Sequence, residues 1–171
     1  MIDSCETPMD SKLLRVSEYL SACKTGSDFN PMAIAGLLPH VFVLEIERDV
    51  ATQQPRLRIR LMGGELDIAF GRSLVGKYLE AFIHGPRGAE VIEGFHDCAN
   101  THEPLWMRQI VQIRDKSPRF VEGILFYLAP ERIYGALLVG NLTHDERSSF
   151  ERKSLRASVE HARRLDIAAA R

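Results

Sequence analysis

Residues 119–142, RFVEGILFYLAPERIYGALLVGNL, decide the fold because they contain two apolar strand candidates joined by a short turn. The strands are Arg119–Leu128 and Ile133–Leu142, and the APE segment between them has a composition typical of hairpin turns. A third candidate, Leu105–Arg114, precedes them and is followed by a second turn segment, DKSP. These residues are therefore expected to form a three-stranded antiparallel meander.

Two more strand candidates, His40–Glu47 and Arg56–Met62, lie earlier in the chain and are joined by the polar segment 48–55. In the second of them three apolar residues alternate with three arginines, which predicts one buried and one charged face: Leu57, Ile59 and Leu61, against Arg56, Arg58 and Arg60. We interpret that charged stripe as a solvated edge, because no aromatic residues are interleaved as a single-stranded nucleic acid platform would need.

The apolar pattern also predicts which strands are central. Within the first and fifth candidates, Val41–Ile46 and Ile133–Leu142 are apolar on both faces apart from Glu45 and Asn141, so both faces of these segments must be covered. The second and third carry charged and polar residues that suit edges, namely Arg56, Arg58, Arg60, Arg108, Gln112 and Arg114. The strand order 2-1-5-4-3 satisfies these conditions.

Helical patterns surround the strands. Leu13, Val16, Leu20 and Cys23 form a narrow stripe on a helix over residues 11–24, and Asn30 with Pro31 should begin a short helical turn that Pro39 ends. Short helical pieces broken by glycine fill residues 63–86, and a longer helix runs from about residue 87 to 100. Thr143 and Glu146 form a capping box that opens a helix to the C-terminus. We therefore expect an α+β fold in which helices cross one face of a five-stranded antiparallel sheet.

Composition limits the function classes. The 171 residues include 22 Lys and Arg and 23 Asp and Glu, so a net charge of −1 provides no global field for nucleic acid or anionic lipid. The first ten residues lack the pattern of a secretory signal, and the longest apolar run, Ile133–Gly140, is too short to span a bilayer. Cys5, Cys23 and Cys98 form neither a disulfide framework nor a zinc motif, which favours a reducing compartment. We expect a soluble cytoplasmic protein.

Three segments resemble a bacterial PAS-like family over roughly residues 10–143: NPMAIAGLLPHVFVLEIE, RIRLMGGELDIAFGRSLVGKYL and VEGILFYLAPERIYGALLVGNL. The LLPH motif before a strand and the pattern R-L-x-G-x(6)-F-G-R-x-L-x-G carry the resemblance, since several Gly, Pro and Arg positions must coincide. The resemblance implies the PAS fold and a sensory or regulatory role, without an enzymatic activity. It divides the chain into a flanking helix at 1–27, a PAS-like domain at 28–143 and a C-terminal helix at 144–171.

The turn glycines of that pattern have a structural interpretation. Gly71 and Gly76 are expected where the backbone φ is positive or a neighbour comes close. Arg72 between them could hold a ligand carboxylate or phosphate, or could bond a carbonyl or the carboxylate of Glu65 or Asp67.

No common catalytic or phosphate-binding motif is present. Four metal-capable residues gather at His84, His96, Cys98 and His102, but their spacing gives no tetrahedral set, so we predict no metal site. Gly85 and Gly88 at a helix start could receive an anion, although a plain helix start explains them equally well.

Two cofactors are weighed because related sensors use them. Some PAS-like sensors bind haem through a histidine of the long helix, where His96 lies, yet a helical histidine is more often an ordinary half-buried side chain. The light-sensing flavin subclass carries its reactive cysteine in an N-C-R-F motif, which neither Cys98 nor Asn100 reproduces. The cofactor therefore stays unknown at this point.

The candidate ligand pocket lies between the sheet and the helices. Large apolar residues with two polar contacts could line it, or could simply fill the core. The candidates are Phe70, Arg72, Leu79, Phe82, Ile92, Phe95, His96, Trp106 and Phe126.

Our leading hypothesis is a PAS-like sensory or regulatory module that binds a small molecule or a protein partner in signal transduction. One face of the central strands would be left without cover, so we expect a homodimer through the N-terminal helix and that sheet face, with a signalling partner on the C-terminal helix. The alternatives are a haem sensor and a small-molecule enzyme or carrier with a cone-shaped α+β fold, whose acid/base candidates would be Asp67, His96 and Asp97.

Overall fold

The computed structural model describes residues 9–83, 85–111, 119–144 and 163–164. Its α-helices are α1 (Ser11–Ala22), α2 (Gly64–Phe70) and α3 (Gly85–Thr101), and its 3-10 helices are η1 (Gly26–Asp28), η2 (Pro31–His40) and η3 (Leu79–Ala81). The strands are β1 (Val41–Arg48), β2 (Pro55–Met62), β3 (Leu105–Val111), β4 (Arg119–Leu128), β5 (Arg132–Asn141) and β6 (Arg163–Arg164). None of the helices in the described ranges is long and apolar enough to cross a membrane.

The strands form one antiparallel sheet in the order β2-β1-β5-β4-β3-β6. The predicted order 2-1-5-4-3 is therefore confirmed, with β1 and β5 paired at the centre. The two-residue β6 pairs with Leu105 and Trp106 on the outer edge of β3.

The prediction of a helix that continues to the C-terminus is wrong at Arg163 and Arg164, which form a strand. The outer edge of β3 has free N–H and C=O groups with which these residues form backbone hydrogen bonds. The competing helix would bury few large apolar side chains, so strand pairing is favoured here. His144 is helical, and the rest of the predicted C-terminal helix lies outside the described residues.

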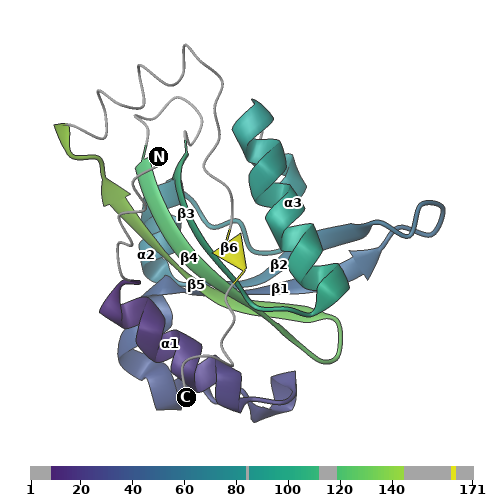
Figure 1. The fold of residues 1–171 in the computed structure, drawn as a ribbon, viewed down its shortest axis with the longest axis horizontal. Helices are drawn as coiled ribbons and strands as arrows, with labels where there is room; N and C mark the ends of the chain where they lie inside the picture. The colour runs from purple at the N-terminus through teal and green to yellow at the C-terminus, as the bar shows by residue number, and fades with distance from the viewer. Residues whose placement is uncertain (1–8, 84, 112–118, 145–162, 165–171) are drawn as a thin grey trace, which may run out of the picture.

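Alternation along the strands divides the core into two layers, one on each face of the sheet. On one face α2, η3 and α3 pack on side chains such as Phe42, Leu44, Leu57 and Leu125, and we call this the helix-side layer. On the other face, called the second face, α1 and η2 pack on Val41, Val43, Ile124, Phe126 and Tyr134. Figure 1 shows α3 and α1 on opposite sides of the sheet.

Helix α1 covers part of the second face within the same chain. Asp10 caps it by accepting a hydrogen bond from the Lys12 backbone N–H at 2.8 Å. Three residues of the predicted stripe, Leu13, Val16 and Leu20, are at most 1% exposed and belong to the second-face core. The premise that this face would be left without cover is therefore wrong, since α1 packs on its own sheet, and the homodimer stays a prediction.

The linker to β1 has the predicted start. Asn30 caps η2 by accepting a hydrogen bond from the Met32 backbone N–H at 3.0 Å, and Pro31 is the first helical residue. The element continues through Pro39 to His40, one residue beyond the predicted end. It directly precedes β1 and adds Ile34 and Leu37 to the second-face core.

Strand β2 contains an irregularity that its sequence pattern hides. Leu57 and Ile59 point into the helix-side layer as predicted, whereas Leu61 packs on the second face. The register with β1 shifts between Val43 and Leu44, so that Arg60 is an extra residue and the side chains beyond it exchange faces. The prediction that Leu61 shares a face with Leu57 and Ile59 is wrong for this reason.

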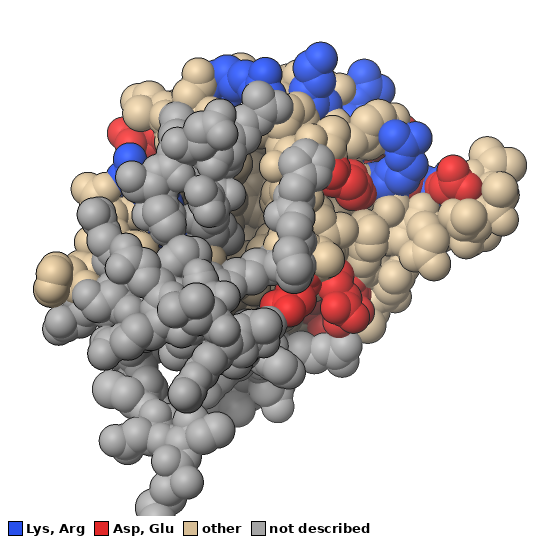
Figure 2. Space-filling view, turned by 90° about the horizontal axis from the view of Figure 1, so that it is seen from above, with Lys and Arg blue, Asp and Glu red and all other residues tan. Residues whose placement is uncertain are grey.

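The arginines of β2 lie on the surface, as expected for a charged face, although residues 76–80 cover the outer edge of the strand. Arg56 and Arg60 are exposed and Arg58 is half-buried. Two of them pair with carboxylates of the neighbouring strand, Arg58 with Glu47 at 3.5 Å and Arg60 with Glu45 at 3.6 Å. Figure 2, seen from above, shows that both signs of charge are present on the described surface.

Candidate functional site

Most of the predicted pocket residues meet in the helix-side layer. Phe95 and Leu79 are buried in it, and three half-buried residues, Phe70, Phe82 and Ile92, pack against it. They come from α2, α3 and the segment around η3, which the fold brings to one face of the sheet. Phe95 also contacts the sheet directly, with its ring centroid 6.0 Å from that of Phe42.

Trp106 and Phe126 do not line this layer, contrary to the prediction. Both belong to the second face, because Leu105, Met107 and Leu125 occupy the helix-side positions of β3 and β4. The indole N–H of Trp106 donates a hydrogen bond to Glu122 Oε1 at 3.0 Å. The period-two alternation of a strand requires this separation, since adjacent residues point to opposite faces.

Arg72 is exposed at the turn after α2. Its guanidinium carbon lies 5.1 Å from the centroid of the Phe82 ring, which is a cation–π arrangement. The flanking Gly71 and Gly76 have φ values of 76° and 82°, which confirms the structural interpretation of these glycines. Arg72 therefore lies at the border of the helix-side layer, against one of its half-buried aromatic residues.

A polar junction links α3, η3 and the edge strand β2. His96 Nε2 lies 3.3 Å from Glu80 Oε1, and the same carboxylate oxygen accepts the Leu57 backbone N–H at 2.9 Å. The other carboxylate oxygen, Glu80 Oε2, is buried and has no hydrogen-bond partner. Burial raises the pKa of Glu80, while hydrogen bonds to its carboxylate from His96, from its own backbone N–H and from Leu57 lower it, and the lowering prevails.

Local sequence spacing could not reveal this junction. Glu80 and His96 are 16 residues apart, and Leu57 lies a further 23 residues before Glu80. The segment just before Glu80 is hydrogen-bonded to β2 at Ile59. The Ile59 N–H donates to Lys77 O at 2.8 Å, and the Ile59 carbonyl accepts from Gly76 N at 2.7 Å. These hydrogen bonds give the backbone groups of Ile59 partners on the outer edge of β2, and they place Glu80 beside that edge.

The remaining metal and acid/base candidates are separated by the fold. His102 stacks on the Tyr127 ring with a centroid distance of 3.7 Å, and Cys98 is buried. Asp67 is half-buried on α2, and Asp97 is exposed on α3. Among the described residues no group of three or more side chains could hold a metal ion, and His84 lies outside them.

Cys98 is an unreactive thiol in this setting. Burial raises its pKa to about 12, against a smaller lowering by a hydrogen bond with the Tyr127 backbone. Beside it is a cavity of about 60 Å³ lined by Gly94, Asp97, Cys98, Thr101 and the segment 103–105. Such a cavity is large enough for water but much smaller than the roughly 300–1,000 Å³ of small-molecule pockets.

Comparison with known proteins supports the fold. No family model matches the chain, and no curated protein matches it. A light-oxygen-voltage (LOV) domain studied with a flavin analogue superposes with a TM-score of 0.51 at 9% identity, covering 74% of this chain and 94% of that one. The aureochrome1 LOV domain in its light state and the LOV protein of Rhodobacter sphaeroides follow with TM-scores of 0.48 and 0.45, at 7% and 12% identity. They cover 72% and 82% of this chain, and 96% and 74% of their own lengths.

The first of these similarities and the strand order together identify the α+β fold of PAS and LOV domains in this chain. The described residues of the helix-side layer do not fit a flavin, the group whose analogue was studied in the first of these domains. Buried apolar side chains such as Phe42, Leu57 and Phe95 fill the helix-side layer. Its described cysteine, Cys98, lies on α3 with a thiol pKa of about 12, so it is not poised to act as a nucleophile.

Proposed function

We propose that this chain is a PAS-type sensory or regulatory module that binds a small apolar molecule in the helix-side layer and acts in signal transduction. The observation that carries the proposal is the buried oxygen Glu80 Oε2, which has no hydrogen-bond partner. A buried acceptor without a partner costs roughly 1–3 kcal/mol. A ligand with one hydrogen-bond donor would remove that cost.

The surroundings of Glu80 support this assignment. Half-buried Phe70, Phe82 and Ile92 border the layer and are the side chains that would move to admit a ligand. Glu80 also contacts both α3, through His96, and the edge strand, through Leu57. A ligand bound at this carboxylate would therefore act on a helix and on the sheet at once.

The alternatives have less support. Haem iron bound at Nε2 of His96 would have to displace Glu80 Oε1, which lies 3.3 Å from that nitrogen. A cone-shaped enzyme or carrier usually places its helices before an uninterrupted sheet, whereas here β1 and β2 precede α2 and α3. We assign no catalytic step to the chain.

The test uses two matched probes, indole and benzofuran, which have similar shape but differ in the N–H donor. Native mass spectrometry of freshly purified protein first identifies any retained molecule, and NMR titration then compares the probes. Because a hydrogen bond to a charged group contributes roughly 1.5–3 kcal/mol, we expect indole to bind at least about tenfold more tightly.

Glu80→Gln should reduce this preference, whereas Glu93→Gln, at an exposed position on α3, should retain it. The proposal fails if the wild-type protein retains no small molecule and binds neither probe. Its assignment to Glu80 fails if both variants bind indole equally.

A further inference from the structure

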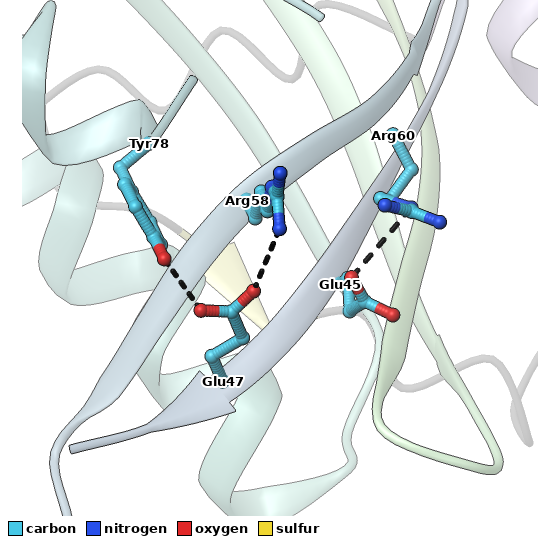
Figure 3. A network of polar contacts seen from close by, with 5 residues as sticks. All are labelled: Glu45, Glu47, Arg58, Arg60 and Tyr78. Atoms are coloured by element: carbon cyan, nitrogen blue, oxygen red, sulfur yellow. Dashed lines mark hydrogen bonds and ion pairs between the residues drawn. The ribbon is translucent and has the colours of Figure 1, made fainter. Parts of the chain in front are cut away.

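The end of the second face that α1 leaves open carries a dense group of charged side chains, which we call the charged face. Its members come from three neighbouring strands and from the segment before η3: Glu45 and Glu47 on β1, Arg56, Arg58 and Arg60 on β2, Arg132 on β5, and Tyr78. Figure 3 shows five of them extending from β1, β2 and the Tyr78 segment. Tyr78 donates its hydroxyl to Glu47 Oε2 at 2.5 Å, and the Arg56 guanidinium carbon lies 4.0 Å from the centroid of its ring.

The strand register aligns four of these residues in one row across the sheet. Tyr78 bridges to Arg58, Arg58 pairs with Glu45, and Glu45 pairs with Arg132. The next row on the same face pairs Arg56 with Glu47. The charged face therefore has a column of arginines on β2 beside a column of glutamates on β1.

These side chains remain accessible. The exposed fractions of the side chains are 40% for Arg58, 48% for Arg60, 37% for Glu47 and 30% for Glu45. Each of the two ion pairs is a single contact of 3.5 Å or longer, which leaves donors and acceptors unused. The hydrogen bond from Tyr78, and then the nearby Arg58, lower the pKa of Glu47, so the carboxylate is ionised at neutral pH.

We propose that the charged face binds the same face of a second copy of this chain, around a two-fold axis that runs parallel to the strands between β1 and β2. Such an axis exchanges the two columns, so Arg58 of one copy lies over Glu45 of the other and Arg56 lies over Glu47. It also places Tyr78 opposite Arg132, a cation–π pairing. One symmetry operation therefore makes the whole row self-complementary.

A second copy suits this surface better than an acidic partner. The arginine column alone would attract an acidic segment, but the adjacent Glu45 and Glu47 would repel it. A partner must present the same two columns in opposite order, which the two-fold axis provides. Because the contacts are charged and half-exposed, the dimer should be weak and sensitive to salt.

The experiment is sedimentation velocity on the wild-type protein at about 20 mM and about 500 mM NaCl, where the Debye length falls from roughly 20 Å to 4 Å. We expect dimers at low salt and at least about tenfold weaker association at high salt. A monomer at low salt overturns the proposal.

Charge reversal then tests the pairing. Arg58→Glu and Glu45→Arg should each weaken self-association by at least about tenfold, because each places like charges opposite one another. A mixture of the two variants should form heterodimers, since every glutamate of the row in one chain then faces an arginine of the other. The control Arg15→Glu, at an exposed position of α1, should associate like the wild type.

Circular dichroism shows whether each variant is folded. If a charge-reversal variant does not fold, Arg58→Gln is used in its place. Dimers that persist in Arg58→Glu or Arg58→Gln overturn the proposal. So does a mixture of folded reversal variants that stays monomeric.

Discussion

The second face of the sheet has two halves that begin on the same strand. In β1, Val41 and Val43 lie under α1 and η2 and are at most 6% exposed, whereas Glu45 and Glu47, two and four residues further on, lie in the charged face. Strand β1 keeps its alternation through both halves, although its register with β2 shifts between Val43 and Leu44. The covered half ends where valine gives way to glutamate on this face.

The two halves should contribute very differently to stability. Burying a Leu or Val side chain stabilises a fold by roughly 1.5–3 kcal/mol, whereas an exposed ion pair contributes about 0–1 kcal/mol. The half under α1 is thus structural, and the charged face is free to serve recognition. The following predictions test this contrast, from the largest expected effect to the smallest.

Leu13→Ala should destabilise the protein by about 2–5 kcal/mol, because Leu13 is 0% exposed in the second-face core. Urea unfolding monitored by circular dichroism measures the change. The neighbouring Leu14 is 48% exposed, so Leu14→Ala should change the free energy of unfolding by no more than about 0.5 kcal/mol. Equal effects of the two substitutions would contradict the docking of α1 on its own sheet.

Trp106→Phe should cost about 1–3 kcal/mol, because it removes a donor from a carboxylate that is only 5% exposed. Glu122 Oε1 accepts from the Trp106 indole at 3.0 Å and from the Asp10 backbone N–H at 3.1 Å, so it ties the start of α1 to the sheet. Relative to the wild type, the substitution should accelerate amide hydrogen exchange in α1 more than in α3. Unchanged exchange in α1 would show that Glu122 does not anchor it.

Glu80→Gln should cost about 1 kcal/mol at pH 7, and the cost should depend on pH. Because the folded pKa of Glu80 lies below its unfolded value of roughly 4.3, its contribution is present above that pH and is lost as the pH falls through the folded pKa. The difference in unfolding free energy between wild type and variant should therefore shrink below about pH 4.3. A difference that stays constant down to about pH 3 would show that Glu80 is not held as a carboxylate.

Arg58→Gln should have the smallest effect, below about 1 kcal/mol, because the Arg58 side chain is 40% exposed and its ion pair with Glu47 is 3.5 Å long. Urea unfolding at low protein concentration, where self-association is excluded, measures it. A loss as large as that of Leu13→Ala would mean that the charged face is part of the structural core.

The sequence predicted the strands and their order because apolar runs and turn compositions are local signals. It could not reveal the shift at Arg60, since the Leu–Arg alternation continues unbroken through the irregularity. The strand alternation did predict that Trp106 and Phe126 lie on the face opposite to that of Leu105 and Leu125. Those two leucines share the helix-side layer with Phe95. The Glu80–His96 junction could be found only from the three-dimensional structure, because it joins segments that are distant in sequence.

The stripe on α1 raised a different difficulty. Leu13, Val16 and Leu20 require an apolar surface, and a second helix or the chain's own sheet would satisfy them equally. Only the three-dimensional arrangement places the helix on Ile124 and Phe126. The sequence therefore predicted that α1 docks, without the identity of the surface that receives it.

The most direct test of this account is an isotope-filtered NOE experiment on an equal mixture of labelled and unlabelled protein at low salt. The account predicts that contacts from Leu13 and Leu20 to Ile124 and Phe126 are all intramolecular. Intermolecular NOEs from these α1 side chains would contradict it, because α1 would then cover the sheet of a second copy.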